Sequence, residues 1–202
     1  MPKIDRKKLL DREYKDRDAR LFVIATEGRE TEKQYFSMFD SSRLKVEVLP
    51  TGDNNKSAPE YIIERLNEFK QKYNLNTDDR LWIVFDVDRW GEEKISQICR
   101  QAKQKEYGLA VSNPCFEVWL WLHIDDLDPK DRTCKNFEDK LRAKIGSYNK
   151  SNLNLDLFKS HIKEAIARAK SLHRDPKQNW TPTIGSHVYR VVEMLFEIIK
   201  ST

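Results

Sequence analysis

The sequence lacks any apolar run long enough to cross a membrane, which takes about 20 consecutive, predominantly apolar residues. Residues 1–6 show none of the apolar core of a signal peptide, so we expect a cytoplasmic protein with no membrane partner. Cysteine is scarce, and the separations between Cys99, Cys115 and Cys134 match no zinc-binding spacing. An odd number of cysteines without a pairing pattern is typical of a reducing compartment, and we interpret all three as structural or incidental.

A strong excess of one charge is also lacking, because Lys and Arg number 37 against 33 for Asp and Glu. The net charge of +4 permits nucleic-acid binding, but an ordinary solvated surface explains it equally well. We find no internal repeat and no low-complexity segment. The 202 residues suffice for one domain with a sizeable core, or for one domain with a small helical extension.

Two short apolar runs, each ending in carboxylate, are the most informative features of the sequence. Residues 21–26 are followed by Glu27, and residues 81–85 by Asp86 and Asp88. Their β-branched and aromatic composition predicts strands buried on both faces. Because ligands of parallel α/β sheets bind at the carboxyl ends of the strands, we expect these acids at one edge of one sheet. Clustered acids repel one another unless a cation lies between them, and a divalent metal is the usual solution.

The sequence up to residue 112 alternates between strand and helix patterns. We predict strands at 21–26, 44–49, 81–86 and 108–112, and helices at 31–39, 59–73 and 92–106. This alternation indicates an α/β fold in which helices flank a small parallel sheet. Ser57 is the expected cap of the second helix, with Pro59 in its first turn.

Beyond Asn113 the pattern changes to helices only. Asn113 and Pro114 predict a helix start, with Asn113 as the cap, and further helices are expected near 134–145, 156–172 and 185–199. The segment 180–187 has two interpretations: a helix start capped by Thr183 or Ser186, or a loop that folds back on the acids. We therefore divide the chain into a charged arm (1–20), an α/β domain (21–112) and an all-helical subdomain packed on it (113–202).

Asp86 and Asp88 project to the same side of an extended chain, so one metal ion can reach both. Acids at strand ends also cap helices and begin turns, and this pair alone does not decide between the two roles. Glu27 favours the metal, because it ends a different strand of the same predicted sheet. Glu32 adds a further carboxylate, although an acid early in a helix is also explained by the helix dipole.

Glu117 is the most unusual acid in the helical half, because residues 115–122 around it are otherwise almost wholly apolar. A buried carboxylate is costly unless it is paired or bound to metal. The alternatives are that Glu117 lies on the wet face of a helix or pairs with an arginine. Three cations adjoin the motifs and are candidates for phosphate contacts, although surface charge is the commoner role: Lys33, Lys56 and Arg89.

Two extended motifs resemble the RloB-like family. Residues 27–36 read EG-x-x-TE-x-x-YF, and residues 112–123 read SNP-x-FE-x-W-x-x-LH. The resemblance covers about residues 20–199. More broadly, Glu27 and Gly28, the strand–helix units and the pair Asp86-x-Asp88 resemble the Toprim domain of topoisomerases, primases and OLD-type nucleases.

The resemblance implies a Toprim-like sheet and a phosphodiesterase site that depends on Mg²⁺ or Mn²⁺. It implies that Glu27 acts as general base or metal ligand and that Asp86 and Asp88 hold metal. By similarity to the OLD nucleases, Glu32 and Glu117 would complete a second metal position. Members of the family occur near restriction–modification and abortive-infection genes, often beside an ATPase of the RloA type.

Three functions remain open from the sequence. The first is a metal-dependent nuclease of phage defence that cleaves DNA or RNA, with an ATPase partner and a possible homo-oligomeric state. The second is a non-catalytic nucleic-acid-binding or sensor subunit, in which the acid cluster is vestigial. The third is a primase- or topoisomerase-like enzyme, ranked last because the chain is short for the accessory domains of such enzymes.

Overall fold

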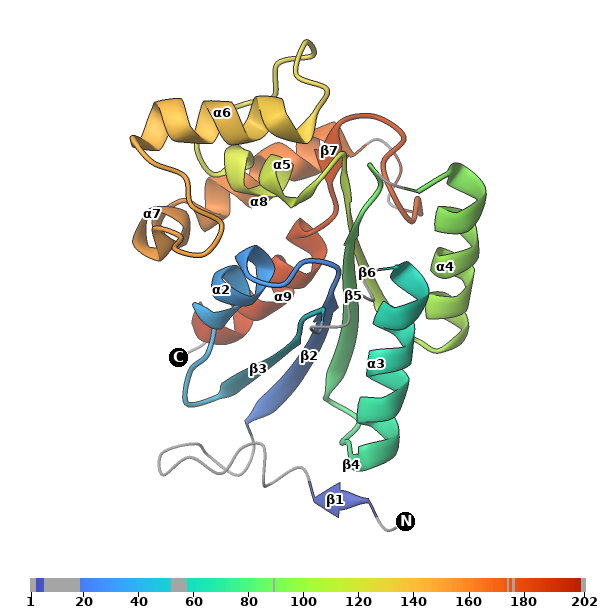
Figure 1. Cartoon of the computed structure of the whole chain (residues 1–202). Helices are drawn as coiled ribbons and strands as arrows, with labels where there is room; N and C mark the ends of the chain where they lie inside the picture. The colour runs from blue at the N-terminus through green and yellow to red at the C-terminus, as the bar shows by residue number, and fades with distance from the viewer. Residues whose placement is uncertain are drawn as a thin grey trace.

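A mixed five-stranded sheet organises the chain in the computed structural model, which describes residues 3–5, 19–51, 58–88, 90–173, 175 and 177–200 (Figure 1). The strand order is β3-β2-β5-β6-β7. Four strands are parallel: β2 (Arg20–Thr26), β3 (Leu44–Leu49), β5 (Arg80–Asp86) and β6 (Gly108–Asn113). The short β7 (Gly185–Ser186) runs antiparallel to β6. A second, two-stranded sheet pairs β1 (Ile4–Asp5) with β4 (Tyr73–Asn74).

Helices cover both faces of the sheet (Figure 1). One face carries α3 (Pro59–Lys72) and α4 (Glu92–Gln104), and the other carries α2 (Thr31–Ser37) and α9 (Tyr189–Lys200). On this second side a helical layer continues past the carboxyl ends of the strands, formed by α5 (Phe116–Leu122), α6 (Cys134–Ile145), α7 (Leu155–Ser160) and α8 (Ile162–Leu172). In the described part of the chain, no helix is both long and apolar enough to cross a membrane.

Strand β2 shows why the sheet has a core on each face. Phe22 and Ile24 belong to the core under α2, α5 and α9, whereas Leu21, Val23 and Ala25 belong to the core under α3 and α4. Successive side chains of a strand point to opposite faces, so an unbroken apolar run fills both cores. The predicted α/β fold with a flanked, mostly parallel sheet is confirmed.

The helix predicted over 156–172 is two helices, α7 and α8, which meet at His161. The Ser160 hydroxyl donates to the Asp156 carbonyl at 2.8 Å, and the His161 ring contacts the Leu157 carbonyl at 2.9 Å. Side chains thus satisfy carbonyls that would otherwise accept from the helical backbone, and such local bonds compete with a continuous helix.

The prediction of a helix cap at Asn113 is wrong. Strand β6 continues through Asn113, which pairs with Gly185 of β7, and the first helical turn is capped at Cys115. The Asn113 side-chain amide donates to the Thr181 carbonyl at 2.9 Å, so it is not available to cap α5. The Asn113–Pro114 peptide bond is cis. Ser57, the predicted cap of α3, lies outside the described residues, and Ala58 is the residue at that cap.

The segment 180–187 contributes a strand, and neither Thr183 nor Ser186 begins the last helix. Ser186 pairs with Ser112, their hydroxyls lie 2.9 Å apart, and the Ser186 oxygen accepts the Val188 N–H. Helix α9 begins only at Tyr189. The region after residue 113 is therefore helical except for β7. Of the predicted charged arm, the structure describes only residues 3–5 and 19–20.

The close packing of β6 on β5 can be tested at Gly108, which pairs with Trp82. A Cβ atom added at Gly108 would lie 2.3 Å from the Trp82 ring, so Gly108→Ala forces the indole to move. We expect a loss of about 1–3 kcal/mol in the free energy of unfolding, measured by urea denaturation.

Gly91→Ala is the matched control, because a Cβ atom there meets nothing within 4 Å. Because Gly91 is the N-cap residue of α4, where alanine is less favourable than glycine, we expect a loss of at most about 1 kcal/mol, partly offset because alanine restricts the unfolded chain. Equal stability of the two variants would contradict the packing argument.

Candidate active site

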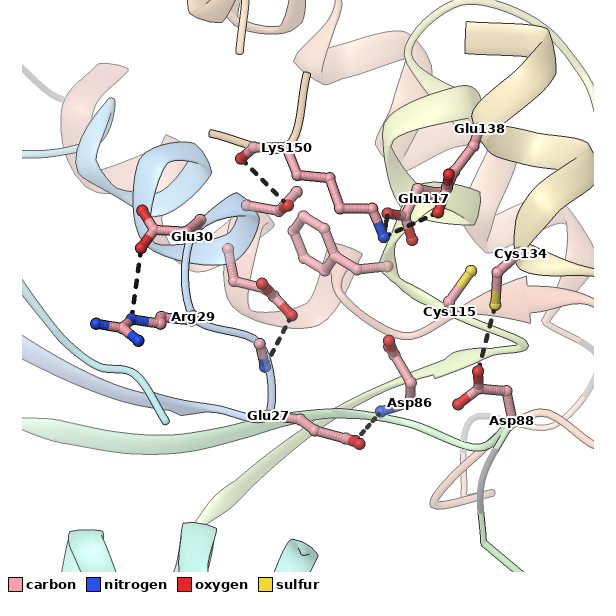
Figure 2. A pocket seen from close by; sticks show the side chains of 14 residues that line it. Glu27, Arg29, Glu30, Asp86, Asp88, Cys115, Glu117, Cys134, Glu138 and Lys150 are labelled. Atoms are coloured by element: carbon pink, nitrogen blue, oxygen red, sulfur yellow. Dashed lines mark hydrogen bonds and ion pairs between the residues drawn. The ribbon is translucent and has the colours of Figure 1, made fainter. Parts of the chain in front are cut away.

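A cavity of about 370 Å³ opens at the carboxyl ends of β2 and β5 (Figure 2). Its walls come from the ends of these strands, from α2 and α5, from α6 and from the loop after α6. Among the described residues, two cations line it, Arg29 and Lys150. Seven carboxyl groups line it, among them all five that the sequence nominated as metal ligands: Glu27, Glu30, Glu32, Asp86, Asp88, Glu117 and Glu138.

Glu27 links the ends of the two central strands. Its backbone N–H donates to the Val84 carbonyl at 2.9 Å, which extends the pairing of β2 with β5. Its carboxylate Oε2 accepts the backbone N–H of Asp86 at 3.1 Å (Figure 2). Because both contacts reach β5, the Glu27 side chain is fixed beside Asp86, and it is only 8% exposed.

The backbone beneath Glu27 is held from the opposite face of the sheet. Arg65 of α3 donates to the Thr26 carbonyl at 2.6 Å and to the Thr51 hydroxyl at 3.2 Å. The Thr51 hydroxyl in turn donates to the Glu27 carbonyl at 2.6 Å. These contacts fix the point at which the chain leaves β2, and they place Arg65 and Thr51 as positioning residues that the sequence patterns did not reveal.

Gly28 makes room for the Glu32 side chain. The Gly28 N–H donates to Glu32 Oε1 at 3.2 Å, and a Cβ atom at position 28 would lie 2.1 Å from the same carboxylate. A side chain at position 28 would therefore displace the Glu32 carboxylate from this hydrogen bond, and the backbone of Gly28 is not left-handed. Glu32 itself is 5% exposed, and burial, followed by the charges of Glu117 and Glu27, raises its pKa to about 7.

Asp86 shares this electrostatic strain. Burial raises the pKa of its carboxyl group well above the usual value, and the nearby charges of Glu32, Glu27, Glu117 and Asp88 add to the effect. Asp88 is exposed, and the Cys134 thiol donates to its Oδ2 at 3.5 Å. Burial, together with the charges of the neighbouring carboxyl groups, thus favours the protonated forms of Asp86 and Glu32.

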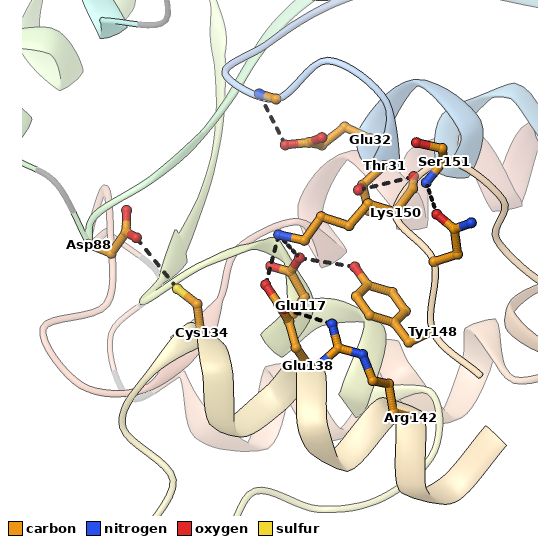
Figure 3. Close-up of polar contacts among 12 residues, drawn as sticks. Thr31, Glu32, Asp88, Glu117, Cys134, Glu138, Arg142, Tyr148, Lys150 and Ser151 are labelled. Atoms are coloured by element: carbon orange, nitrogen blue, oxygen red, sulfur yellow. Dashed lines mark hydrogen bonds and ion pairs between the residues drawn. The ribbon is translucent and has the colours of Figure 1, made fainter. Parts of the chain in front are cut away.

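Glu117 is neutralised within the protein. The Lys150 ammonium lies 2.9 Å from Glu117 Oε1 and 2.9 Å from Glu138 Oε1, and the Tyr148 hydroxyl donates to Glu117 Oε1 at 2.9 Å (Figure 3). Burial alone would raise the pKa of Glu117, but the hydrogen bond and charge of Lys150 outweigh it, and the pKa is lowered. The partner is a lysine, so the prediction of a wet helix face or an arginine partner is wrong.

Lys150 is positioned by α2 although it lies in the loop after α6. The side-chain amide of Gln34 donates to the Lys150 carbonyl at 2.8 Å and accepts the Leu153 N–H at 2.9 Å. The Thr31 hydroxyl also donates to the Lys150 carbonyl, at 3.4 Å (Figure 3). The ammonium that compensates Glu117 is therefore held by the same helix that carries Glu32.

Two of the three cysteines line the cavity. Cys115 caps α5, Cys134 begins α6, and their sulfur atoms point toward one another in Figure 2. The hydrogen bond with Cys134, then burial and the charge of Glu117, raise the pKa of the Cys115 thiol. A protonated Cys115 lines the cavity and can act as a weak hydrogen-bond donor. The third cysteine, Cys99, is buried in the core under α4.

The remaining motif residues build the core behind the cavity. Tyr35, Phe116 and Trp119 are buried, and the Tyr35 ring packs edge-on against both of the others. His123 is held between Tyr35 and Trp119: its Nε2 lies 3.1 Å from the Tyr35 hydroxyl, and its Nδ1 lies 3.0 Å from the Trp119 carbonyl. Burial lowers the His123 pKa to about 3, so this histidine is neutral and structural.

The two motifs thus supply one continuous unit, in which the acids face the cavity and the aromatic residues pack behind them. A family model described as RloB-like protein matches residues 22–195. The chain belongs to the RloB-like family. No curated protein and no solved structure matches it.

The acids of this RloB-like protein are chemically suitable ligands for a hard cation, but they are not arranged as a formed metal site. Carboxylate oxygens are the ligands that Mg²⁺ takes from proteins, and a cation would relieve the repulsion that raises the pKa values of Glu32 and Asp86. Among the described residues, however, no three His, Cys, Asp or Glu side chains are already arranged to hold a metal ion. Binding would therefore require side chains of the cavity to move closer together; Glu27 and Glu32 each accept a backbone N–H with one carboxylate oxygen.

Of the three cations nominated for phosphate contact, Lys33 alone lies among the described residues. Lys33 is exposed on α2 and does not line the cavity. Lys56 and Arg89 lie outside the described residues. The cation that does reach the acids, Lys150, carried no sequence signal, because it lies in a polar loop with no motif around it.

The raised pKa of Glu32 makes the metal-free fold less stable as the pH rises. In the unfolded chain the carboxyl group loses its proton near pH 4.5, whereas the folded protein keeps that proton up to about pH 7. Stability contributed by this group is therefore lost between these values, by about 3 kcal/mol in total. Urea denaturation in EDTA at several pH values should show this loss, and Glu32→Gln should remove it. An unchanged pH slope in the variant would contradict the assignment.

We expect Lys150 to stabilise the folded protein chiefly because it compensates the buried charge of Glu117. Lys150→Met keeps the apolar stem but leaves the Glu117 side chain, 5% exposed, without its ion pair. Because the lysine end is half-exposed, we expect a loss of about 1–3 kcal/mol in unfolding free energy. Glu117→Gln added to this variant should recover part of the loss, since an amide needs no counter-charge.

Lys200→Met is the control for Lys150→Met, because the Lys200 ion pair with Glu197 is exposed on both sides and should contribute about 0–1 kcal/mol. Losses of the same size in the two methionine variants would show that Glu117 does not depend on Lys150.

Proposed function

We propose that this RloB-like protein is a nuclease that depends on Mg²⁺ or Mn²⁺ and hydrolyses phosphodiester bonds in DNA or RNA. One observation carries the proposal: seven carboxyl groups from β2, β5 and the adjoining helices converge on a single open cavity. Burial and the charges of the neighbouring carboxyl groups raise the pKa values of two of them, Glu32 and Asp86. A bound cation would compensate the charges of these carboxyl groups, and it could also hold a phosphodiester substrate.

In this proposal Asp86, Asp88 and Glu27 are the catalytic acids, and Glu32 and Glu117 complete the set of metal ligands. A bound divalent ion would lower the pKa of a water molecule and polarise the scissile phosphate. Glu27 is fixed to both central strands and is placed to take up a proton as general base or to serve as a ligand. Lys150, released from Glu117, would meet a phosphate oxygen at the same wall of the cavity.

The setting of this activity is a further part of the proposal. The Glu27-Gly28 turn after the first strand of the parallel sheet and Asp86-x-Asp88 after the third correspond to the Toprim resemblance of the sequence. By the same resemblance we propose a role in anti-phage defence beside an ATPase of the RloA type, with a homo-oligomer as one possible assembly. These assignments rest on the family motifs rather than on the geometry of the cavity.

A specific observation favours a second candidate, a nucleic-acid-binding or sensor subunit without chemistry. Lys150 already compensates Glu117 and Glu138, while Glu27 and Glu32 are engaged by backbone N–H groups. A cavity whose acids are satisfied internally can persist without a metal. The two candidates differ in one property, namely whether the wild-type protein binds a divalent ion.

The test compares the wild type with Asp86→Asn and Asp88→Asn. We expect calorimetry to detect Mn²⁺ or Mg²⁺ binding by the wild type, and DNA or RNA cleavage that EDTA abolishes. Each variant should reduce cleavage at least about 100-fold, because loss of a direct ligand exceeds the effect of losing an outer hydrogen-bond partner. Assays with and without an ATPase partner cover activation in a complex.

Glu164→Gln is the matched control, because Glu164 is an exposed acid of α8 and does not line the cavity. It should keep the metal affinity and cleavage rate of the wild type. A folded wild type that binds no divalent ion and cleaves nothing, alone or with its partner, would refute the nuclease and leave the sensor.

A further inference from the structure

A second cavity, of about 410 Å³, lies beside the outer edge of β6 and carries the opposite charge. Strand β7 pairs only with Ser112 and Asn113, so it leaves the earlier residues of β6 at the rim of the sheet. Lys103 at the end of α4, Lys177 in the loop before β7 and Arg190 at the start of α9 line this cavity. None of its described lining residues is a carboxylate; the others are Trp82, Tyr107, Leu109 and Asn179.

A neighbouring cavity of about 460 Å³ shares Tyr107 and adds three cations, Lys70, Arg80 and Lys105. Its acids are Glu106 and Asp79, and the Asp79 carboxylate accepts the N–H groups of Leu21 and Asn76 at 3.2 and 2.7 Å. Asp79 is therefore engaged within the fold. We name the surface formed by the two cavities the basic edge, defined by six cations: Lys70, Arg80, Lys103, Lys105, Lys177 and Arg190.

One further acid belongs to the loop that carries Lys177. The Asp175 carboxylate accepts the Lys177 backbone N–H at 2.9 Å. This contact involves the backbone, so the exposed Lys177 ammonium is not consumed by it. Arg190 donates to the Gln178 carbonyl at 2.8 Å and lies 3.2 Å from His173 Nε2, which fixes its guanidinium beside the loop.

Strand β5 connects the two charged regions. Trp82 lines the basic cavity and Asp86 lines the carboxylate cavity, four positions further along the same strand. At about 3.3 Å per residue this separation is roughly 13 Å. In B-form DNA, in which successive phosphates of one strand advance about 3.4 Å along the axis, the same distance is about four nucleotide steps.

We propose that the basic edge binds the phosphate backbone of the nucleic acid whose scissile bond lies in the carboxylate cavity, at a point several nucleotides away from that bond. The nature of this partner rests on the proposed function. The aromatic rings of Trp82 and Tyr107 are 8% and 5% exposed, so they are not free to stack on bases. The exposed cations of the basic edge have no base-reading geometry of their own, so recognition is by charge and independent of base sequence; they are Lys70, Arg80, Lys103, Lys105 and Lys177.

Given the proposed nuclease reaction, a nucleic acid fits the carboxylate cavity and the basic edge better than an acidic protein does. Seven carboxyl groups in the first cavity repel any polyanion, and only a ligand that itself coordinates a divalent ion gains there once the ion is bound. Carboxylates of an acidic peptide can also coordinate such an ion, but in the proposed nuclease reaction the ligand of the ion is a phosphodiester, so the choice of nucleic acid follows from that proposed function. Nucleic acid is therefore the partner that a metal-loaded cavity and the basic edge bind together.

The test is fluorescence anisotropy with labelled DNA and RNA oligonucleotides, single-stranded and duplex, in EDTA so that nothing is cleaved. Lys103→Glu/Lys177→Glu should raise the dissociation constant roughly tenfold or more and reduce the slope of log affinity against log salt by about two. Lys103→Gln/Lys177→Gln should give a smaller change in the same direction. Thermal unfolding of each variant shows that the fold is retained.

Lys159→Glu/Lys163→Glu is the control, because it makes the same change in net charge at exposed lysines of α7 and α8 that line neither cavity. Equal weakening by the two charge reversals would overturn the proposal, since the effect would then be one of net charge. Competition by poly-glutamate as effective, per charge, as that by the oligonucleotide would also overturn it, in favour of an acidic protein partner.

Calorimetry with Mn²⁺ separates this proposal from the nuclease itself. Loss of oligonucleotide binding with intact Mn²⁺ binding in Lys103→Glu/Lys177→Glu supports the basic edge. If the wild type binds no Mn²⁺ but the variant still loses oligonucleotide binding, the result supports the basic edge and contradicts the proposed nuclease. A wild type that binds Mn²⁺ but no oligonucleotide overturns the basic edge and leaves the metal site standing.

Discussion

The mutual repulsion of carboxyl groups at the carboxyl ends of β2 and β5 is the constraint on which the rest of this structure depends. Parallel pairing of these strands places Glu27 against the backbone of Asp86, and α2 folds Glu32 back over Gly28. Burial and neighbouring charge then raise the pKa values of Glu32 and Asp86. Protonation of these carboxyl groups and hydrogen bonds from backbone N–H groups reduce the repulsion. A bound cation would change both, because it favours the ionised carboxylates and competes for their oxygens.

The surroundings of the cavity show how the fold contains that repulsion. Arg65 and Thr51 fix the backbone at Glu27 from the far side of the sheet, so the acid does not move away from Asp86. Lys150 compensates Glu117 from a loop that α2 holds in place. The six cations of the basic edge gather beside the amino-terminal halves of β5 and β6. A nearly neutral chain thus presents one acidic and one basic region, a polarity that its net charge of +4 conceals.

Much of the fold could be predicted because its causes are local. The apolar runs of β2 and β5 indicate strands buried on both faces, and helix and strand periods elsewhere place most boundaries within a few residues. The helix predicted over 156–172 divides because of local side-chain bonds at Ser160 and His161, whereas the error at Asn113 arose because a distant segment intervened. Asn113 reads as a helix cap, but its amide binds the carbonyl of Thr181 and its backbone pairs with β7. No pattern around Asn113 indicates that partner, which comes from a segment more than sixty residues later.

The sequence by itself determined that acids follow two buried strands, that Glu117 lies in an apolar helix, and that the chain carries the RloB-like motifs. Only the tertiary structure decided what surrounds those acids, because Tyr148, Lys150, Glu138 and Cys134 reach them through the packing of α6 and its following loop on α5 and α2. Periodicity and capping act over a few residues and are readable from the chain. Charge compensation depends on distances in space, and those are set by packing.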